Sequence, residues 1–345
     1  MAHFCIRLLL PCLLAGSMGG CTQEAPLSIE EPGQPVMISL SNRALNAGVT
    51  GEQVNTLRLL LVDRNNIDRS VVCNRFIDSP ASPLLVQVVS GMFDVYVVAN
   101  EMPDNSQSAS LQNVKNLRDI RQVALPYSPD DRDMTNIPMF GEVLQVGITA
   151  AAGEVSPDNP GSVTVAGQSK GSTLPVTLTR MACKVKLTLK CGRGTLKAVE
   201  FNNLPDAIPL FEDNYITPAG RKVKTVDINK FTAASPSFDS QYSTIVEQAD
   251  ILLPSWVFAD TDNSSQAVQL KATITEDDVD NSYTSAIGHE VGSDSASKNY
   301  TLLRNKDYTL TASVTNYMVT IGASVTSWAD QSLSIEDNKP VIPDL

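Results

Sequence analysis

The chain contains one stretch that indicates its fold class more clearly than any other: Cys183-Lys184-Val185-Lys186-Leu187-Thr188-Leu189-Lys190-Cys191. Apolar residues occupy every second position, with lysine or threonine between them. Successive side chains of a strand point to opposite faces, so this period of two predicts a β-strand with one buried face. Both cysteines fall on that face. At about 3.3 Å per residue they are roughly 26 Å apart, too far for a disulfide, so we expect buried free thiols.

The same alternation recurs along the chain. Further strands are predicted at 36–41, 57–61, 93–99, 143–148, 163–165, 196–201, 251–258, 268–274, 308–314 and 317–325. One short helix is expected over 110–120, where apolar residues recur every three positions. Residues 150–172 are rich in Gly, Ser, Pro and Ala and contain the best boundary. We therefore predict an all-β fold with a minor α content, built as tandem β-sandwich domains at 44–168 and 169–345.

The N-terminus has the layout of an export signal. Arg7 precedes a short apolar run at 8–15, and small residues lead to Cys21. The run is too short to span a bilayer, which needs about 20 residues. Gly19-Gly20-Cys21 resembles a lipobox, although Met18 stands where Leu is usual. We predict a signal peptide at 1–20 and a lipid (palmitate) on Cys21, hence an outer-membrane-attached surface lipoprotein. An ordinary signal peptide with an incidental Cys21 is the alternative.

Composition argues against several classes of function. The chain has a net charge of −12 and a pI near 4.7, so nucleic acid and anionic lipid are poor partners. After loss of the signal only His289 remains, which speaks against histidine-based catalysis or a histidine-rich metal site. Acidic runs at 260–263 and 276–281 lack the glycine and distant glutamate of an EF-hand and are interpreted as solvated loops. We predict no enzyme activity, no cofactor and no metal.

Several motifs, taken in order, are similar to those of a known family. They are a lipobox; Ser41-Asn42-Arg43-Ala44 ahead of a strand; Val95-Tyr96-Val97-Val98-Ala99-Asn100 before a short helix; Ile137-Pro138-Met139-Phe140-Gly141-Glu142; Leu178-Thr179-Arg180-Met181-Ala182-Cys183-Lys184-Val185; and Arg304-Asn305-Lys306-Asp307-Tyr308 before a strand that ends at Trp328. Together they resemble the fimbrillins, the major fimbrial subunits of the Bacteroides group. Two details depart from the family pattern: Phe140 replaces a small residue, and Cys183 stands between the usual alanine and lysine.

The resemblance implies two transthyretin-like sandwiches and maturation by an Arg-specific protease. Carried onto this sequence, the cleavage lies between Arg43 and Ala44 and removes a leader at 21–43. The resemblance further implies that another subunit's C-terminal segment replaces the lost strand, so that subunits form a homo- or heteropolymer. An ordinary surface arginine in a loop is the alternative for Arg43.

The residues are compatible with such an exchange. Val36, Ile38 and Leu40 alternate with Met37 and Ser39, as expected of a removable core strand whose loss opens an apolar groove and an unpaired sheet edge. The candidate donor residues in the C-terminal tail are Leu333, Ile335, Val341 and Ile342. Pro340 and Pro343 interrupt this tail, so the inserted part is expected to be short. The alternative is a disordered tail.

We therefore predict a structural subunit of a cell-surface fimbria that supports adhesion. A fimbrial anchor, accessory or tip subunit is a close variant, distinguished by whether the acylated Cys21 is retained. From another class, a ligand- or glycan-binding surface lipoprotein stays open, although aromatic residues make up only 6% of the chain.

Overall fold

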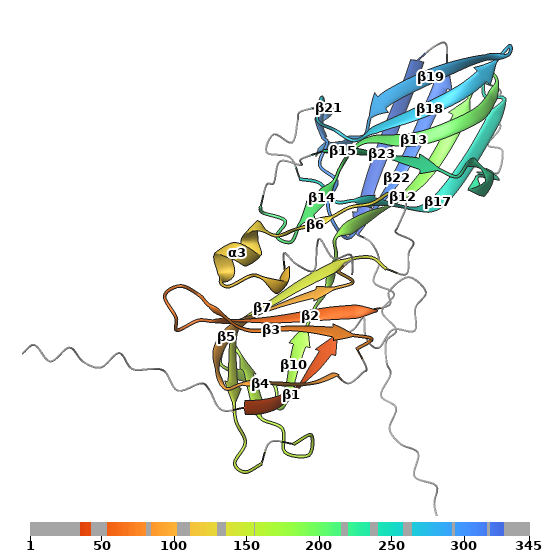
Figure 1. Ribbon diagram of the computed structural model, residues 1–345. Coiled ribbons are helices and arrows are strands. Elements are labelled where there is room, and N and C mark those ends of the chain that lie inside the picture. The colour runs from red at the N-terminus through yellow and green to blue at the C-terminus, as the bar shows by residue number, and fades with distance from the viewer. Residues whose placement is uncertain are drawn as a thin grey trace, which may run out of the picture. The chain divides into compact units, whose positions relative to one another are not determined.

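The computed structural model describes residues 35–42, 54–80, 84–101, 111–129, 136–154, 156–214, 220–234, 241–257, 264–291, 294–315 and 318–327. Nearly all the regular structure in these ranges is β-strand (Figure 1). Two sheets are formed within residues 35–180 and two larger sheets within residues 182–327, so the predicted all-β, sandwich-type fold is confirmed. Within these ranges, no helix is long and apolar enough to cross a bilayer.

The N-terminal half contains a three-stranded sheet facing a seven-stranded one. The small sheet has the order β10 (Thr173–Val176), β1 (Pro35–Asn42), β4 (Leu84–Val89). The large sheet has the order β3 (Val71–Asp78), β2 (Thr56–Asp63), β5 (Gly91–Ala99), β7 (Met139–Thr149), β8 (Ser162–Val165), β9 (Gln168–Ser169). Its seventh strand, β11 (Thr179–Arg180), pairs with β7. The predicted boundary between 168 and 169 falls inside β9, and the sheets of this half extend to Arg180.

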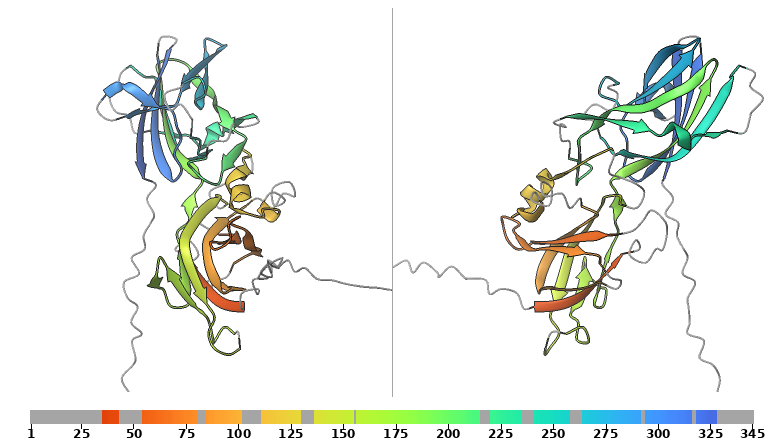
Figure 2. Two further views of the ribbon diagram at one scale, coloured as in Figure 1. Left: turned by 90° about the vertical axis from the view of Figure 1, so that its left-hand side faces the viewer. Right: turned by 45° about the vertical axis from the view of Figure 1, so that its right-hand side comes forward.

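The C-terminal half repeats the two-sheet plan (Figure 2). One sheet has the order β16 (Thr232–Ala233), β17 (Thr244–Pro254), β12 (Ala182–Cys191), β22 (Lys306–Thr315), β23 (Met318–Ser327). The other has the order β15 (Arg221–Val226), β13 (Thr195–Pro205), β18 (Gln269–Glu276), β19 (Val279–Ala286). Smaller elements are the pair β6 (Ala124–Pro126) with β14 (Ala207–Pro209), the pair β20 (His289–Val291) with β21 (Asp294–Asn299), and the 3-10 helix η1 (Ile228–Lys230).

The central strands of the seven-stranded sheet are covered on both faces, which explains their continuous apolar runs. Residues 57–62 of β2 are all buried. Leu57, Leu59 and Leu61 join the core under the β1 sheet, whereas Leu60 and Val62 join a second core. That second core continues into the C-terminal half, where the Phe211 ring lies 5.7 Å from the Tyr96 ring. One sheet therefore has a core on each side.

The helix predicted over 110–120 is interrupted. Helix α3 begins only at Leu117 and ends at Gln122, with Asn116 as its N-cap. The preceding turn is held by β3 instead, because Val71 N donates to Lys115 O at 2.7 Å. The apolar stripe is real, since Leu111, Val114 and Ile120 are buried, but the backbone between them pairs with a strand.

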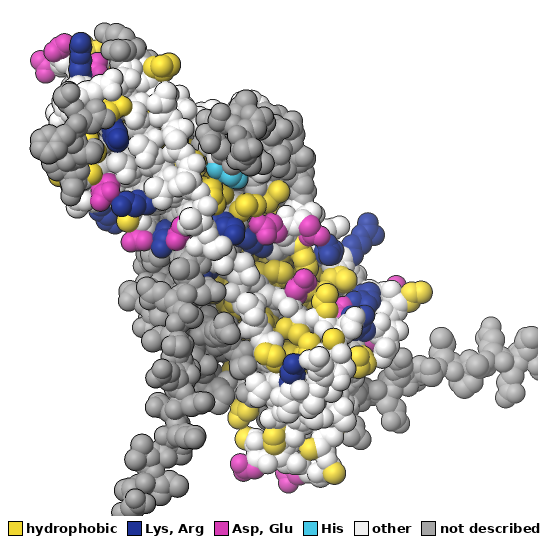
Figure 3. All heavy atoms as spheres, turned by 180° about the vertical axis from the view of Figure 1, so that it is seen from behind, with side chains coloured by type: hydrophobic (Ala, Val, Ile, Leu, Met, Phe, Trp, Pro, Cys, Tyr) yellow, Lys and Arg dark blue, Asp and Glu magenta, His cyan; other side chains and the backbone are white. Residues whose placement is uncertain are grey.

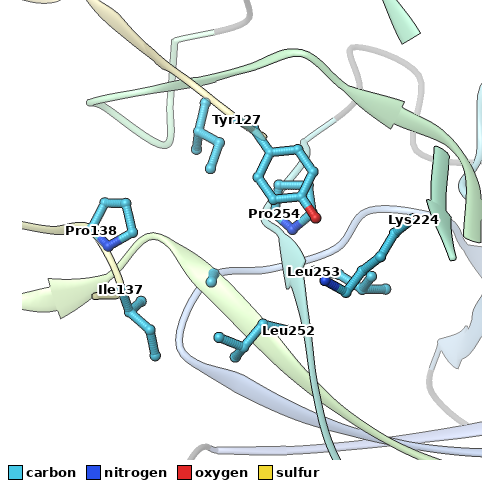
Figure 4. Close-up of a pocket in the computed structure, with 9 residues that line it drawn as sticks. Tyr127, Ile137, Pro138, Lys224, Leu252, Leu253 and Pro254 are labelled. Atoms are coloured by element: carbon cyan, nitrogen blue, oxygen red, sulfur yellow. The ribbon is translucent and has the colours of Figure 1, made fainter. Parts of the chain in front are cut away.

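A small apolar cavity lies where the two halves meet (Figure 4). Tyr127, Ile137 and Pro138 line it together with Leu252 and other residues of the C-terminal half. Its volume of about 10 Å³ is at the lower limit for one water molecule, and apolar cavities of this kind stay dry. It therefore reflects close packing between the halves and offers no room for a ligand.

Candidate functional site

The predicted removable strand is the middle strand of its sheet. β1 pairs antiparallel with β4 along 35–40 and parallel with β10 along 39–42. Among the described residues the sheet has these three strands, so β4 and β10 are both joined to it through β1. The strand ends at Asn42, directly before the predicted cleavage residue Arg43.

Val36 anchors β1 in the core below it. Its side chain is 1% exposed and belongs to the cluster that contains Leu57, Leu59 and Leu61 of β2. It also packs against the backbone at Gly161, where an added Cβ would lie 2.1 Å from Val36 Cγ1. A glycine at 161 therefore makes the space that the Val36 side chain fills.

Ile38 and Leu40 occupy register positions opposite buried residues. Ile38 pairs with Val86, and Leu40 pairs with Leu84 on one side and Leu174 on the other. These three partners are 2%, 8% and 0% exposed. The structure describes the backbone of β1 at positions 38 and 40, and the inward orientation of their side chains stays a prediction.

The other predicted site residues lie outside the described part of the chain. They are Cys21, Arg43 and Ala44 near the N-terminus, and Leu333, Ile335, Val341 and Ile342 in the tail. Lipidation, cleavage and strand donation therefore stay predictions.

The motifs that carried the sequence resemblance meet at the junction of the two halves. Arg180 Nη1 donates to Asn305 Oδ1 at 2.7 Å, and Asn305 N donates to Ala182 O at 2.9 Å. Asn100 Nδ2 donates to Ile137 O at 2.9 Å. Segments far apart in sequence are thus joined through buried polar side chains, and such side chains need these partners to be tolerated in the interior.

A buried ion pair at the end of β2 was not anticipated from the sequence. Arg58 and Glu101 are 3% and 2% exposed, and Arg58 Nη2 lies 2.6 Å from Glu101 Oε1. Arg58 Nη1 also donates to Asn74 Oδ1 at 2.7 Å. The only sequence signal is that an arginine interrupts the apolar run 57–62. A strand that is buried on both faces can contain a charged residue when that charge is paired.

The cysteines have no catalytic setting. Cys183 and Cys191 are fully buried and free, as predicted, and Cys73 is also free. Burial raises the pKa of the Cys183 thiol to about 12 and that of Cys191 to about 11, so both stay protonated at neutral pH. Burial also lowers the pKa of His289, whose ring lies 6.1 Å from that of Tyr308. Among the described residues no group of three or more His, Cys, Asp or Glu could hold a metal ion.

The fold is shared with solved bacterial surface proteins. The tip fimbrial protein Mfa3 from Porphyromonas gingivalis, solved with a C-terminal truncation, matches 86% of this chain over 100% of its own length, with a TM-score of 0.56 and 17% identity. A "putative cell adhesion protein" from Parabacteroides distasonis matches 86% of this chain over 98% of its own, with a TM-score of 0.53 and 14% identity.

The chain has a Bacteroidales fimbrial-protein fold. No protein-family model and no curated protein matches the sequence. At these identities the likeness establishes the fold, and the sequence resemblance to fimbrillins is confirmed at that level. In this fold, β1 is the segment of the predicted site whose backbone the structure describes.

Proposed function

We propose that this protein is a structural, non-enzymatic subunit of a cell-surface fimbria. In this proposal the precursor is exported as a lipoprotein through Cys21, matured by cleavage after Arg43, and polymerised by strand exchange. The observation that carries the proposal is the position of β1 between β4 and β10, with its last residue next to Arg43. The fold of a tip fimbrial protein supports it.

Removing β1 would be costly for an isolated subunit. Burial of Val36 alone is worth about 1.5–3 kcal/mol, a sizeable part of the roughly 5–15 kcal/mol that stabilises a typical domain. Loss of the strand would also leave β4 and β10 with unpaired backbone groups and expose Val86, Val88 and Leu174. An unpaired sheet edge above an apolar core recruits another strand.

The incoming strand in this proposal is the C-terminal tail of a second subunit. Leu333 and Ile335 alternate with polar residues, which fits a groove whose buried partners alternate along β4. Other fimbrial subunits are the partners, and the Arg-specific protease acts before assembly.

The proposal is tested by treating the full chain with an Arg-specific protease and following it on SDS gels without boiling. Cleavage after Arg43 is expected to give a ladder of SDS-resistant oligomers. An Arg43→Ala chain should stay monomeric under the same treatment. A Leu333→Asp/Ile335→Asp chain should be cleaved but give no ladder. Fully cleaved wild-type chain that remains a folded monomer would contradict strand exchange.

A tip or anchor role is the second candidate, because the fold matches that of a tip fimbrial protein. A subunit at the end of the fimbria would enter a polymer once, whereas a shaft subunit would repeat. The ratio of this chain to other subunits in isolated fimbriae separates the two roles.

A further inference from the structure

A surface hollow beside α3 is lined by more basic than acidic side chains. It has a volume of about 430 Å³, and its charged lining residues are Arg69, Arg118, Arg121 and Asp68. In the whole chain acidic residues outnumber basic ones, 38 to 26. On the face drawn in Figure 3 the two signs are mixed across the middle of the molecule. Three guanidinium groups around one hollow therefore concentrate positive charge in an acidic protein.

The side chain of Arg69 is held in place by a buried carboxylate. Its Nη2 donates to the carboxylate of Asp94, which is 2% exposed. Asp94 also accepts from Arg64 Nη1 at 2.6 Å and from Gln145 N at 3.0 Å. Two arginines thus share one buried carboxylate, so Asp94 balances only one of their two charges; the other acidic group at the hollow is Asp68. Among the described residues, the buried Nε of Arg69 has no hydrogen-bond partner.

Arg121 is oriented by an aromatic ring. Its Cζ lies 4.6 Å from the centroid of Phe211, and a guanidinium stacked on an aromatic face is restricted in its rotation. Its ion pair with Asp213 is long, 3.4 Å, and the two side chains are 49% and 70% exposed. An exposed pair of this kind contributes little, so another anion can compete with Asp213 for the guanidinium.

Arg118 is exposed and has no ion pair within the described residues. It precedes Arg121 by three positions on α3, so the two side chains are neighbours on the helix surface. Like charges at this spacing repel each other, and a bound anion would remove that repulsion.

We propose that this hollow binds the oxyanion group of a small polar ligand, an acidic monosaccharide unit. Guanidinium groups bind carboxylate and sulfate oxygens in paired hydrogen bonds. Gln122 and Asn214 also line the hollow and supply amide groups for sugar hydroxyls. Asn214 Nδ2 donates to Arg121 O, which leaves its Oδ1 to accept from a hydroxyl. The volume lies in the usual range for small-molecule sites.

Carboxylated and sulfated sugars offer the same oxyanion chemistry, and titration of the uncleaved full chain distinguishes them. The probes are glucuronate, N-acetylglucosamine 6-sulfate and uncharged N-acetylglucosamine, followed by NMR or calorimetry. We expect at least one acidic sugar to bind, the uncharged sugar to bind at least about fivefold more weakly, and added salt to weaken binding. Arg118→Gln should lower the affinity by about tenfold or more, as loss of a charge-assisted hydrogen bond does.

Arg193→Gln is the matched control. Arg193 is exposed on the turn between β12 and β13, and its replacement removes the same charge away from the hollow. It should leave the affinity unchanged. The proposal is overturned if neither acidic sugar binds at millimolar concentration, if the uncharged sugar binds equally well, or if the two variants have the same affinity. Because the uncleaved chain is used, this outcome is independent of strand exchange.

Discussion

Val36 of β1 fills the space left by the missing side chain of Gly161. A Cβ at position 161 would lie 2.1 Å from Val36 Cγ1 and 2.5 Å from the backbone oxygen of Thr149. Both distances are much shorter than a van der Waals contact. The Thr149 oxygen belongs to β7, whose backbone is held by pairing with β5 and β8. The packing of the predicted removable strand therefore depends on a glycine 125 positions away in sequence.

Gly161→Ala should accordingly destabilise the uncleaved chain. Overpacking of a closed core costs about 1–3 kcal/mol, and we expect a loss in this range from urea unfolding. Gly322→Ala is the control, since nothing lies within 4 Å of a Cβ at Gly322. It should change stability by less than about 0.5 kcal/mol. Equal stability of the two variants would show that Val36 does not pack on residue 161.

Val36→Ala should destabilise the chain by about 1.5–3 kcal/mol, because two buried methyl groups are lost and a cavity remains. Leu85→Ala provides the comparison on the neighbouring strand β4. Leu85 is 44% exposed, so its truncation should cost well under half as much. If thermal or urea unfolding ranks the two variants in the opposite order, Val36 is not a core residue.

The Arg58–Glu101 pair should be sensitive to loss of one partner. Glu101→Gln leaves a buried guanidinium without its counter-charge, which costs about 3–5 kcal/mol in comparable buried pairs. Glu200→Gln breaks the Lys271–Glu200 pair, whose side chains are 34% and 27% exposed. We expect that change to cost no more than about 1 kcal/mol. Unfolding curves in which the two substitutions have similar effects would argue against a buried pair at Arg58.

The three described cysteines should differ in their reaction with iodoacetamide. Burial raises the pKa of each thiol, to about 12 for Cys183 and about 11 for Cys191, against an ordinary value of 9.0. At pH 8 the thiolate fraction of these two is therefore very small, and both are enclosed. Cys73 is half-buried and should be alkylated slowly by the native chain. Mass spectrometry of peptides should show Cys183 and Cys191 labelled only after unfolding.

The same raised pKa values have a consequence at high pH. The neutral thiol is favoured in the folded state, so the stability it contributes is present below pH 9 and is lost as pH rises toward 11–12. Cys183→Ala/Cys191→Ala should therefore flatten the alkaline decline in stability. If the stability of the double variant falls with pH as steeply as that of the wild type, ionisation of these two thiols is not the cause of the fall.

Strands with one buried face could be predicted because apolar and polar residues alternate along the strand's own sequence. The alternating run 183–191 became β12, and the predicted strand at 308–314 lies within β22. The pairing of strands leaves no comparable local signal. Nothing in residues 39–42 indicates that β10, some 130 positions later, pairs with them in parallel.

The candidate site was predictable only in part for the same reason. Alternation indicated that Val36 is buried, and it is. The role of Gly161 depends on a contact between distant segments, and a lone glycine in a strand-rich sequence can equally mark a bulge, a bend or a turn. Likewise, the helix predicted over 110–120 ran through Asn116, which instead caps α3 because β3 holds the preceding turn.

The most direct test of the central proposal is the N-terminal residue of this chain in fimbriae isolated from the cell surface. Mass spectrometry of the assembled form should find Ala44, with residues 21–43 and their lipid removed. Chains that are assembled within the shaft and still begin at an acylated Cys21, with β1 in place, would contradict polymerisation by exchange of that strand.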